Sequence, residues 1–473
     1  MRALIVCVCF VVVAVSGYSQ GDAPNRNVLL LSVDDLNDWV GVLGGHPQAK
    51  TPSIDALAAR GVLFRNAHCQ APVCNPSRAS MMTSLYPATT GIYFLNPPIR
   101  QSEKARQVRT LPKRYAAEGY VTLAAGKIFH ASGSRTEFQQ YGGNFGGFGP
   151  RPKNKLSPFP GHPLWDWGTF PEKNEGMPDY KIAGWAERQL KKSFTKPFFM
   201  GVGFYRPHVP QYTPQMWRDM HPLDQVVLPE VREDDLDDIP GYALALTREK
   251  HVAPTHDWVV KNDEWKALVQ TYLASSTFVD AQVGRVVKAL ESSAYADNTY
   301  VVLFSDHGFH LGEKERWAKR SLWRDGVRVP LIILGPGIPA GKVCDKPVGL
   351  IDVYPTLLEL TGHDPDVSLE GRSLVPLLKD VEAEWPHLAR SSFGPGNVSL
   401  VSEHFRYIHY KDGSEEFYDN RKDPNEWVNQ IKNPEYADEV DALRARLPKS
   451  YHPVLGGGST GHKAFAAAEQ VSK

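Results

Sequence analysis

The sequence predicts an α/β fold, a mostly parallel sheet flanked by helices, with a small antiparallel-sheet subdomain near the C-terminus. Apolar runs of strand length alternate with helical segments over residues 27–362, which is typical of parallel strands covered on both faces. From about residue 385 the pattern changes to short strands, as in "VSLVSEHFRYIHYKDGSEEFYD" with its Lys-Asp-Gly-Ser turn. The chain has 473 residues, enough for one large domain or two.

The N-terminal segment, residues 1–19, is typical of a secretory signal peptide. Arg2 supplies positive charge, an apolar run follows from Ala3 to Val15, and the small residues Ser16 and Ser19 suit cleavage. The run is short for a bilayer span, and no later stretch is long and apolar enough, so we expect no membrane span. The sequence therefore predicts an exported protein, periplasmic or secreted.

The remaining elements follow in a regular order. The first helix has clear boundary signals, with Thr51 as its cap, Pro52 at its first position and Gly61 at its end. In chain order, we expect a strand at 27–35, a helix at 51–61, a helix and then a strand within 111–130, a strand at 196–210, a long amphipathic helix at 263–292, strands at 298–308 and 329–337, and a helix at 350–362.

These elements divide the mature chain into three parts. Residues 20–384 form the α/β domain, 385–455 the C-terminal subdomain, and 456–473 a flexible tail. Residues 131–180 are rich in glycine, proline and aromatic residues and are predicted to form a long loop. Long ordered loops often have a function.

Acidic residues close two of the apolar runs. Asp34 and Asp35 follow the strand at 27–35, and Asp306 and His307 follow the strand at 298–308. Ligands of such sheets bind beyond the carboxyl ends of the strands, and buried carboxylates that lie together need a positive partner. Oxygen ligands with one histidine favour Ca²⁺ or Mg²⁺.

Basic residues also lie near strand ends and turns. Each by itself is more often a solvated or structural residue, but together with a metal ion they would form a cationic pocket for a tetrahedral anion, phosphate or sulfate. Lysine plus arginine and aspartate plus glutamate both total 53, so the net charge of zero gives no support to nucleic-acid binding. The basic residues concerned are Arg78, Lys127, His130, His208 and Lys319.

The cysteines single out one position. Of the five, Cys7 and Cys9 lie in the predicted signal, which leaves Cys69, Cys74 and Cys344, an odd number for an exported protein. Whether Cys69 and Cys344 pair is left open by the sequence. Cys74 lies in "CNPSRASMMT", which fits the pattern Cys-x-Pro-Ser-Arg and resembles the type I, formylglycine-dependent sulfatase family. The contexts "GKIFH", "RPHVP" and "WAK" look most like its iduronate-2-sulfatase-like branch.

The resemblance extends over about residues 25–430 and implies an alkaline-phosphatase-like fold. It implies that a maturation enzyme converts Cys74 to formylglycine, an aldehyde. Ser84 stands where the family often has glycine, and His310 is a further pocket candidate. The metal ligands implied are Asp34, Asp35, position 74, Asp306 and His307, the last in place of an asparagine in many members, with Ca²⁺ favoured and Mg²⁺ as the alternative. The implied sulfate-binding and proton-transfer residues are Arg78, Lys127, His130, His208 and Lys319.

The resemblance also implies a double displacement at position 74. In it, Asp306 accepts a proton from the nucleophile, and Arg78, Lys127 and Lys319 hold the sulfate oxygens. His208 protonates the leaving alcohol, and His130 removes the second proton.

Two rival functions remain at this stage, a phosphoester or phosphonate hydrolase of the same fold and a non-catalytic binder of sulfated glycans. The expected substrate is a sulfated saccharide, such as a 2-O-sulfated uronic acid or a related sugar. Aromatic and basic residues of the long loop would contact it, although the aromatic residues could equally pack the loop onto the core. They are Trp165, Trp167, Phe170, Arg135, Arg151, Lys153 and Lys155.

Overall fold

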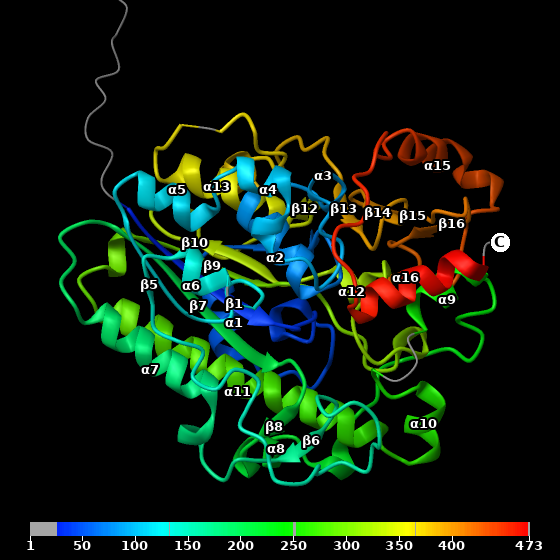
Figure 1. Ribbon diagram of the computed structural model, residues 1–473, viewed down its shortest axis with the longest axis horizontal. Helices are drawn as coiled ribbons and strands as arrows, with labels where there is room; N and C mark the ends of the chain where they lie inside the picture. Colours follow the sequence, from blue (N-terminus) through cyan, green and yellow to red (C-terminus); the bar gives the residue numbers. More distant parts are fainter. Residues whose placement is uncertain (1–25, 132, 249–251, 365, 472–473) are drawn as a thin grey trace, which may run out of the picture.

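The computed structural model describes residues 26–131, 133–248, 252–364 and 366–471. The predicted signal peptide, with Cys7 and Cys9, lies outside the described residues. The described chain folds into a large three-layer unit and a smaller sheet beside it (Figure 1). The fold is the predicted one, α/β with a mixed, mostly parallel central sheet.

The central sheet has eight strands in the order β11-β2-β10-β9-β1-β7-β4-β5. Strand β1 lies in its middle and pairs in parallel with both β7 and β9, while β4 pairs in parallel with β7. Only β10 runs antiparallel to its neighbours, β9 and β2. The bounds are β1 (Asn27–Asp34), β2 (Val62–Phe64), β4 (Val121–Gly126), β5 (Gln140–Tyr141), β7 (Phe198–Pro207), β9 (Thr299–Ser305), β10 (Leu331–Leu334) and β11 (Lys342–Cys344).

Helices cover both faces of this sheet, which explains why its strands are apolar along their whole length (Figure 1). On one face lie α2 (Cys74–Thr83), α4 (Glu103–Gln107), α5 (Leu111–Ala117), α13 (Val353–Leu360) and α14 (Val375–Lys379). On the other face lie α1 (Pro52–Ala58), α7 (Pro178–Leu190) and the long α11 (Trp265–Glu291). The two apolar clusters are separated by the sheet, as alternation of side chains along each strand requires.

The C-terminal subdomain contains a four-stranded antiparallel sheet, as predicted. Its order is β13-β14-β15-β16, so each strand pairs with its neighbour in the sequence. Helix α15 (Ala437–Arg444) packs on it around Phe417 and Tyr436. The strands are β13 (Ala389–Ser392), β14 (Val398–Val401), β15 (Phe405–His409) and β16 (Glu415–Asp419).

The segment expected to be a flexible tail, residues 456–473, contains helix α16 (Thr460–Val471). This helix packs along α9 (Gly241–Thr247), and Ala468 is fully buried between them. The expectation of a flexible tail rested on the position of this segment at the end of the chain. Its alanine-rich sequence is a strong helix former with one apolar face, which explains the difference.

The loop predicted at 131–180 is largely irregular, with short elements inside it, and its last residues begin α7. These elements are α6 (Gly133–Glu137), β5 and β6 (Trp167–Thr169), the last paired with β8 (Gln211–Thr213). The remaining short elements are β3 (Ala67–His68), β12 (Val348–Gly349), α3 (Pro87–Thr90), α8 (Gln215–Asp219), α10 (His256–Lys261) and α12 (Arg324–Val327).

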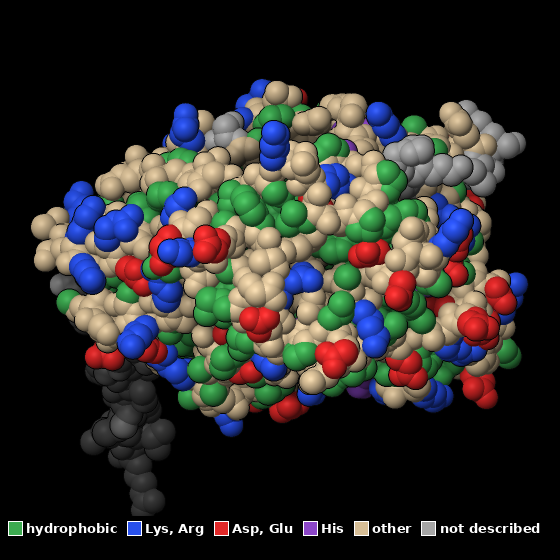
Figure 2. All heavy atoms as spheres, turned by 90° about the horizontal axis from the view of Figure 1, so that it is seen from below, with side chains coloured by type: hydrophobic (Ala, Val, Ile, Leu, Met, Phe, Trp, Pro, Cys, Tyr) green, Lys and Arg blue, Asp and Glu red, His purple; other side chains and the backbone are tan. Residues whose placement is uncertain are grey.

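The formal net charge of the chain is zero at pH 7. On the face drawn in Figure 2, lysine and arginine side chains are interspersed with aspartate and glutamate. Among the helices that the structure describes, none is long and apolar enough to cross a membrane.

Candidate active site

The carboxyl ends of four adjacent parallel strands bring the predicted site residues together. Asp34 ends β1 and Asp35 follows it, Asp306 and His307 follow β9, His208 follows β7, and Lys127 follows β4. In the sheet order these strands are direct neighbours, β9-β1-β7-β4. Residues from distant parts of the sequence therefore meet at one edge of the sheet, as the strand-end argument predicts.

Cys74 is the first residue of α2, and all ten residues of this helix are buried. Its Sγ lies 3.2 Å from Nε2 of His307 and 3.5 Å from Nζ of Lys319. Burial raises the pKa of the Cys74 thiol, and the positive charges of Lys127 and Lys319 offset this only in part. As a cysteine, position 74 is therefore a protonated thiol and a weak nucleophile.

Arg78, one turn further along α2, connects the two acidic strand ends. Its guanidinium is 1% exposed and donates to Asp306 Oδ2 at 2.8 Å and to Asp34 Oδ1 at 3.1 Å. It also donates to the carbonyls of Lys127 and Ile128 at 2.5 and 3.0 Å, and to Ser32. Burial alone would lower the pKa of Arg78, but Asp306 and Asp34 raise it above its ordinary value, so this cation is permanent.

Two lysines are each paired with one carboxylate. Lys127 Nζ lies 2.5 Å from Asp34 Oδ2, and Lys319 Nζ lies 2.6 Å from Asp35 Oδ1. Burial raises the pKa of Asp34, but the charges led by Lys127 outweigh it and hold that pKa well below its usual range. At Asp35 burial outweighs the charges of Lys319 and His307, and the pKa is raised.

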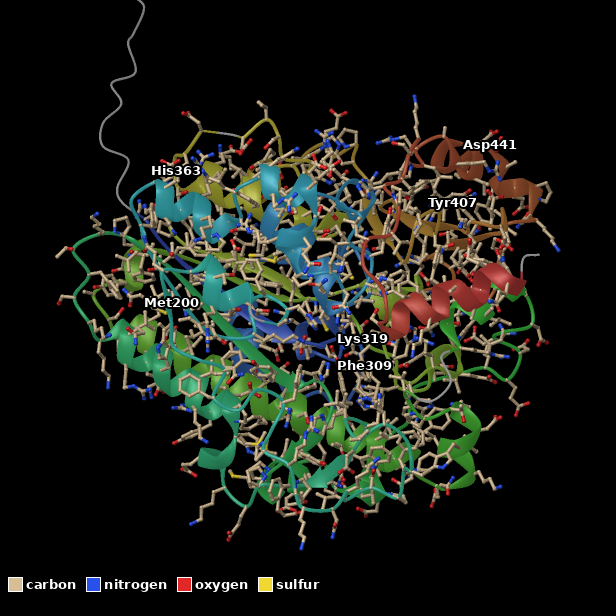
Figure 3. The ribbon with its side chains drawn as sticks, viewed as in Figure 1. Met200, Phe309, Lys319, His363, Tyr407 and Asp441 are labelled. Carbon is tan, nitrogen blue, oxygen red and sulfur yellow. The ribbon has the colours of Figure 1, made fainter. Side chains whose placement is uncertain are left out.

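Backbone contacts fix the positions of Lys127 and Lys319 in the site. Gly126 has a φ of 73°, and a Cβ there would lie 1.9 Å from the carbonyl oxygen of Gly203, so glycine is required where β4 turns toward the site. Lys319 lies in a loop whose next residue, Arg320, donates its N–H to the carbonyl of Pro72 at 3.1 Å. This bond fixes the lysine loop beside the start of α2. Figure 3 labels Lys319 and Phe309, which both follow β9 in the sequence and line the same cavity.

The acidic residues are arranged as a cation site would require. One ligand atom each from Asp34, Cys74, Asp306 and His307 lies within 4.8 Å of the others, and a second group joins Asp34, Asp35, Cys74 and His208. For an ion with ligands at about 2.4 Å, atoms on opposite sides are about 4.8 Å apart. Oδ2 of Asp35 is buried and has no hydrogen-bond partner in the described structure, which is costly unless a cation satisfies it. These residues fit an oxygen-binding divalent cation.

Two histidines lie on the open side of the site. His208 Nε2 is 3.9 Å from Asp35 Oδ2, and its Nδ1 is 2.5 Å from the carbonyl oxygen of Val209. Burial, and then the charge of Lys319, lower the pKa of His208 well below its usual value. Burial and Lys127 lower the pKa of His130 to about 4. Both imidazoles are therefore neutral at pH 7 and able to accept a proton.

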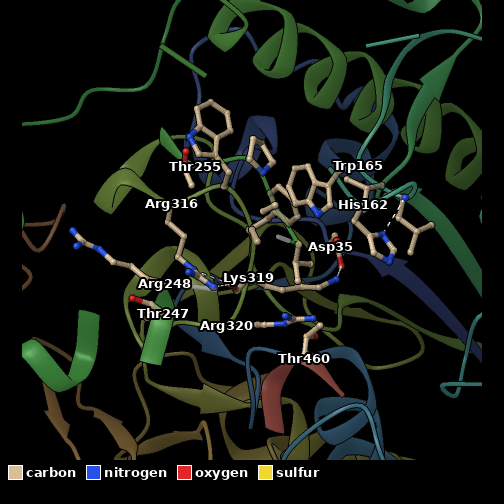
Figure 4. A pocket seen from close by; sticks show the side chains of 18 of the residues that line it. Asp35, His162, Trp165, Thr247, Arg248, Thr255, Arg316, Lys319, Arg320 and Thr460 are labelled. Carbon is tan, nitrogen blue, oxygen red and sulfur yellow. Dashed lines mark hydrogen bonds and ion pairs between the residues drawn. The ribbon is translucent and has the colours of Figure 1, made fainter. Parts of the chain in front are cut away.

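A cavity of about 620 Å³ opens above Cys74 (Figure 4). It is lined by Asp35, Lys127, His130, His208 and Lys319, and it extends well beyond them. Pockets of about 300–1,000 Å³ hold whole small-molecule ligands, so this cavity has far more room than a sulfate group needs. The rest of its wall comes from the 131–180 loop, from the segment around α9 and α10, and from residues 309–320.

The long loop contributes to this cavity through only some of the predicted residues. Trp165 lines it, while Trp167 is buried and donates its Nε1–H to Glu264 at 3.0 Å. Phe170 packs edge-on against Tyr212 instead. Packing onto the core thus explains two of the three aromatic residues. Among the described residues, the loop's predicted basic side chains are not part of the cavity wall, namely Arg135, Arg151, Lys153 and Lys155.

The structure places one predicted residue outside the cavity wall and adds two residues that the sequence did not indicate. His310 is buried, and its Nε2 is hydrogen-bonded to Ser321 Oγ at 2.6 Å. It is not among the described residues that line the cavity. Ser84 takes the left-handed conformation, φ 53°, that a glycine would take. Phe148 was missed, although its ring packs 4.4 Å from that of His208 and 5.0 Å from Nζ of Lys127. Tyr272, also missed, donates to the carbonyl of Asp35 at 2.7 Å.

Two of the remaining cysteines lie apart from the cavity. Cys69 and Cys344 are both buried and free, so they do not form a disulfide with each other. Each belongs to the same apolar cluster on one face of the sheet. Their place in the structure is that of small apolar core residues.

Comparison with known proteins agrees with this geometry. The family model for sulfatases matches residues 26–363, and that for the C-terminal region of N-sulphoglucosamine sulphohydrolase matches residues 312–452. A sulfatase of Formosa agariphila is 40% identical over 447 residues, 91% of this chain and 88% of that protein. Iduronate 2-sulfatase of Mus musculus is 31% identical over 404 residues, 74% and 70% of the two chains. A Δ4,5-hexuronate-2-O-sulfatase of Bacteroides thetaiotaomicron is 27% identical over 456 residues, which are 92% of this chain and 90% of that protein.

Solved structures share the fold. A 2-O GAG sulfatase superposes with a TM-score of 0.69 at 24% identity, over 89% of this chain and 90% of the other. The phosphonate monoester hydrolase of Agrobacterium radiobacter superposes with a TM-score of 0.72 at 22% identity, over 89% of this chain and 94% of the other. Together, the sheet and its buried polar edge define an alkaline-phosphatase-like hydrolase fold. Within it, the family match shows that the chain belongs to the sulfatase family. The protein is a sulfatase, an enzyme that hydrolyses sulfate esters.

Proposed function

We propose that the protein removes an O-sulfate group from a saccharide, using a formylglycine made from Cys74 by a maturation enzyme and one bound Ca²⁺. The observation that carries this proposal is the position of Cys74. It opens a fully buried helix and faces two lysines, one histidine and the acidic strand ends at the floor of a large cavity. The raised pKa of its thiol argues against direct attack by a thiolate.

The cation would be held by Asp34, Asp35, Asp306 and His307, with position 74 beside it. Their carboxylate oxygens favour Ca²⁺ or Mg²⁺, and Ca²⁺ accepts the larger, less regular set of ligands. Bound there, the ion would stabilise negative charge on oxygens at position 74 and on the sulfate. Hydrated formylglycine would supply an oxygen nucleophile and a second hydroxyl for sulfate release.

The basic residues would hold the sulfate group. The three site carboxylates, Asp34, Asp35 and Asp306, are balanced by three cations, Arg78, Lys127 and Lys319. A divalent cation that takes over the carboxylates would leave the two lysines to bind sulfate oxygens. Arg78 donates to five buried acceptors, among them Asp34 and Asp306, so it would fix these two carboxylates relative to α2.

Proton transfer would involve the two histidines and Asp306. Asp306 would take the proton of the attacking hydroxyl, since one of its carboxylate oxygens lies within 4.8 Å of the Cys74 side chain. His208 and the charged Lys319 both lie against Asp35. Because His208 is neutral, the proton for the leaving alcohol would come from the ammonium group of Lys319 and pass through His208. His130 lines the same cavity, and its neutral ring suits the removal of the second hydroxyl proton.

The proposed substrate is a 2-O-sulfated uronic acid or a related sugar of a polysaccharide. Two relatives support it, one named iduronate 2-sulfatase and one named Δ4,5-hexuronate-2-O-sulfatase. The cavity has room for a sugar ring beside the sulfate, and Trp165 offers an aromatic surface in its wall. The N-terminal sequence supports export, periplasmic or secreted, where polysaccharides are encountered.

Mass spectrometry and kinetics test this function. Peptides containing position 74, from protein made with a maturation system, should have lost one sulfur and two hydrogens and gained one oxygen. The matured enzyme should have a kcat/KM for a 2-O-sulfated uronate oligosaccharide about 100-fold above that for an aryl sulfate, a difference of about 2.7 kcal/mol.

The control is Cys74→Ala, which should bind the saccharide without turning it over. Full activity with an unmodified thiol would refute the formylglycine. Faster hydrolysis of the aryl sulfate, with no activity on sulfated glycans, would refute the saccharide. A phosphonate monoester hydrolysed faster than every sulfate ester would favour the rival hydrolase.

A further inference from the structure

Helix α16 lies beyond residue 452, where both family matches have ended. It is nevertheless an integral part of the fold. In Figure 1 it lies, as the red helix, directly alongside α9, and the two helices are in extensive contact. Ala468 is fully buried in an apolar cluster with Tyr242 and Leu246 of α9.

Polar contacts fix the same helix pair. Tyr242 of α9 donates its hydroxyl hydrogen to Glu469 Oε1 at 2.9 Å, and Lys411 forms an ion pair with the other oxygen of Glu469. Close to the start of α16, a Cβ on Gly461 would lie 2.7 Å from the ring of Phe94. The helix is therefore held at both ends, and its first turn has no room to shift toward Phe94.

The first turn of α16 also reaches the cavity above Cys74. Thr460 is part of the cavity wall, together with Leu244 and Thr247 of α9 and the adjacent Arg248. Figure 4 shows Thr460 beside Arg320, on the other side of the view from Thr255 and Trp165. The cation-binding and sulfate-binding residues come from strand ends, from α2 and from the loop that contains Lys319, so this wall is built from a different part of the chain.

We propose that α16 and α9 form the wall of the cavity that faces the leaving group, and that Thr460 limits the size of the group attached to the sulfate. The inference rests on the proposed function, because it assumes that sulfate is held beside Cys74. Sulfate itself needs only a small part of a 620 Å³ cavity, so the remaining walls contact whatever the sulfate is attached to. A wall whose helix is held at both ends cannot move aside, so it discriminates between leaving groups by steric exclusion.

The test compares Thr460→Trp with Lys463→Trp in the full-length, matured enzyme. Lys463 lies three residues further along the same helix and is exposed, so the control adds the same ring outside the cavity. Three substrates of increasing size are used: 4-nitrophenyl sulfate, 4-methylumbelliferyl sulfate and a 2-O-sulfated uronate disaccharide. Thr460→Leu provides a smaller change in case the tryptophan variant does not fold, and unfolding midpoints are measured for all variants.

We expect the loss of kcat/KM in Thr460→Trp to grow with the leaving group, from less than twofold for 4-nitrophenyl sulfate to about tenfold or more for the largest ester that the wild type cleaves. The loss should lie mainly in KM, should be smaller in Thr460→Leu, and should be absent in Lys463→Trp. An equal loss for all three substrates, or no difference between the position 460 variants and the control, would overturn the inference. A wild type that cleaves none of the three esters would instead refute the proposed function.

Discussion

Replacement of Arg78 by lysine separates the two consequences of its five hydrogen bonds, stability and activity. Lysine keeps the charge but has three donors at one point, so at least two buried acceptors lose their partner. An unsatisfied buried acceptor costs about 1–3 kcal/mol, so we expect a loss of about 2–6 kcal/mol. For a chain of 473 residues the entropy of unfolding is about 1 kcal/mol/K, so the unfolding midpoint should fall by about 2–6 °C.

Activity should fall as well, because Arg78 fixes Asp34 and Asp306 relative to position 74. We expect kcat/KM for a sulfate ester to drop about 100-fold, comparable to loss of a preorganised donor. The matched control is Arg406→Lys in β15. Arg406 is equally buried and pairs with Glu426, away from the described cavity wall. It should lose stability without losing turnover.

Differential scanning calorimetry and steady-state kinetics on the folded protein measure both quantities. Arg78→Lys with unchanged midpoint and turnover would refute the reasoning from hydrogen-bond counts. An equal loss of activity in Arg406→Lys would show that the effect reflects stability in general, and not the placement of the acidic residues.

Three further predictions concern the cation, the end of α2 and the start of α1. Chelation of divalent ions should lower activity and the unfolding midpoint together, and Ca²⁺ should restore both, because the cation satisfies Asp35; full activity in protein shown to be metal-free would contradict this. Ser84→Gly should stabilise the fold by about 1 kcal/mol, because glycine adopts the φ of 53° without strain. It should also destabilise the fold by about 1 kcal/mol for each of the two hydrogen bonds that the Ser84 hydroxyl makes with the backbone of Ile351 and Gly371. The midpoint should therefore fall slightly, and a higher one would show that strain dominates.

The third prediction is a pH dependence at Asp280, whose carboxylate accepts the N–H groups of Ser53 and Ile54 at the start of α1. Burial raises its pKa to about 6, above the unfolded value of about 3.9, so the folded state binds more protons between these values. The contribution of Asp280 to the free energy of unfolding should thus fall by about 2–3 kcal/mol as pH rises from about 4 to about 6. Asp280→Asn should lose this slope in urea titrations, whereas an unchanged slope would place its origin at other groups.

Much of the site could be predicted from the sequence because strand ends carry positional information. A continuous apolar run that ends in Asp34 and Asp35 specifies both a buried strand and the edge where its polar residues lie. The same reasoning placed Asp306, Lys127 and His208, although it could not give their distances. Sequence periodicity does not encode strand direction, so the antiparallel pairing of β10 was not foreseen.

The residues that were missed act through contacts between distant segments. Phe148 packs on His208 across 60 positions of the sequence, and nothing in "GGFGP" indicates that neighbour. Tyr272 lies within a long amphipathic helix, where an aromatic residue is expected in the core in any case. Helix α16 was not foreseen because its segment was interpreted from its position at the end of the chain, and its contacts with α9 join residues far apart in the sequence.

The wide spacing of the site along the chain has a consequence for folding. Lys319 contacts Asp35 and Cys74 across 284 and 245 residues, and Cys74 contacts His307 across 233. Contacts of such high sequence separation close large loops and form late, after local helices and hairpins. No fragment that lacks either the first strand or the 306–319 segment contains the site. Recovery of turnover during refolding is therefore a stricter measure of native topology than recovery of secondary structure, and it should lag behind the far-ultraviolet circular dichroism signal.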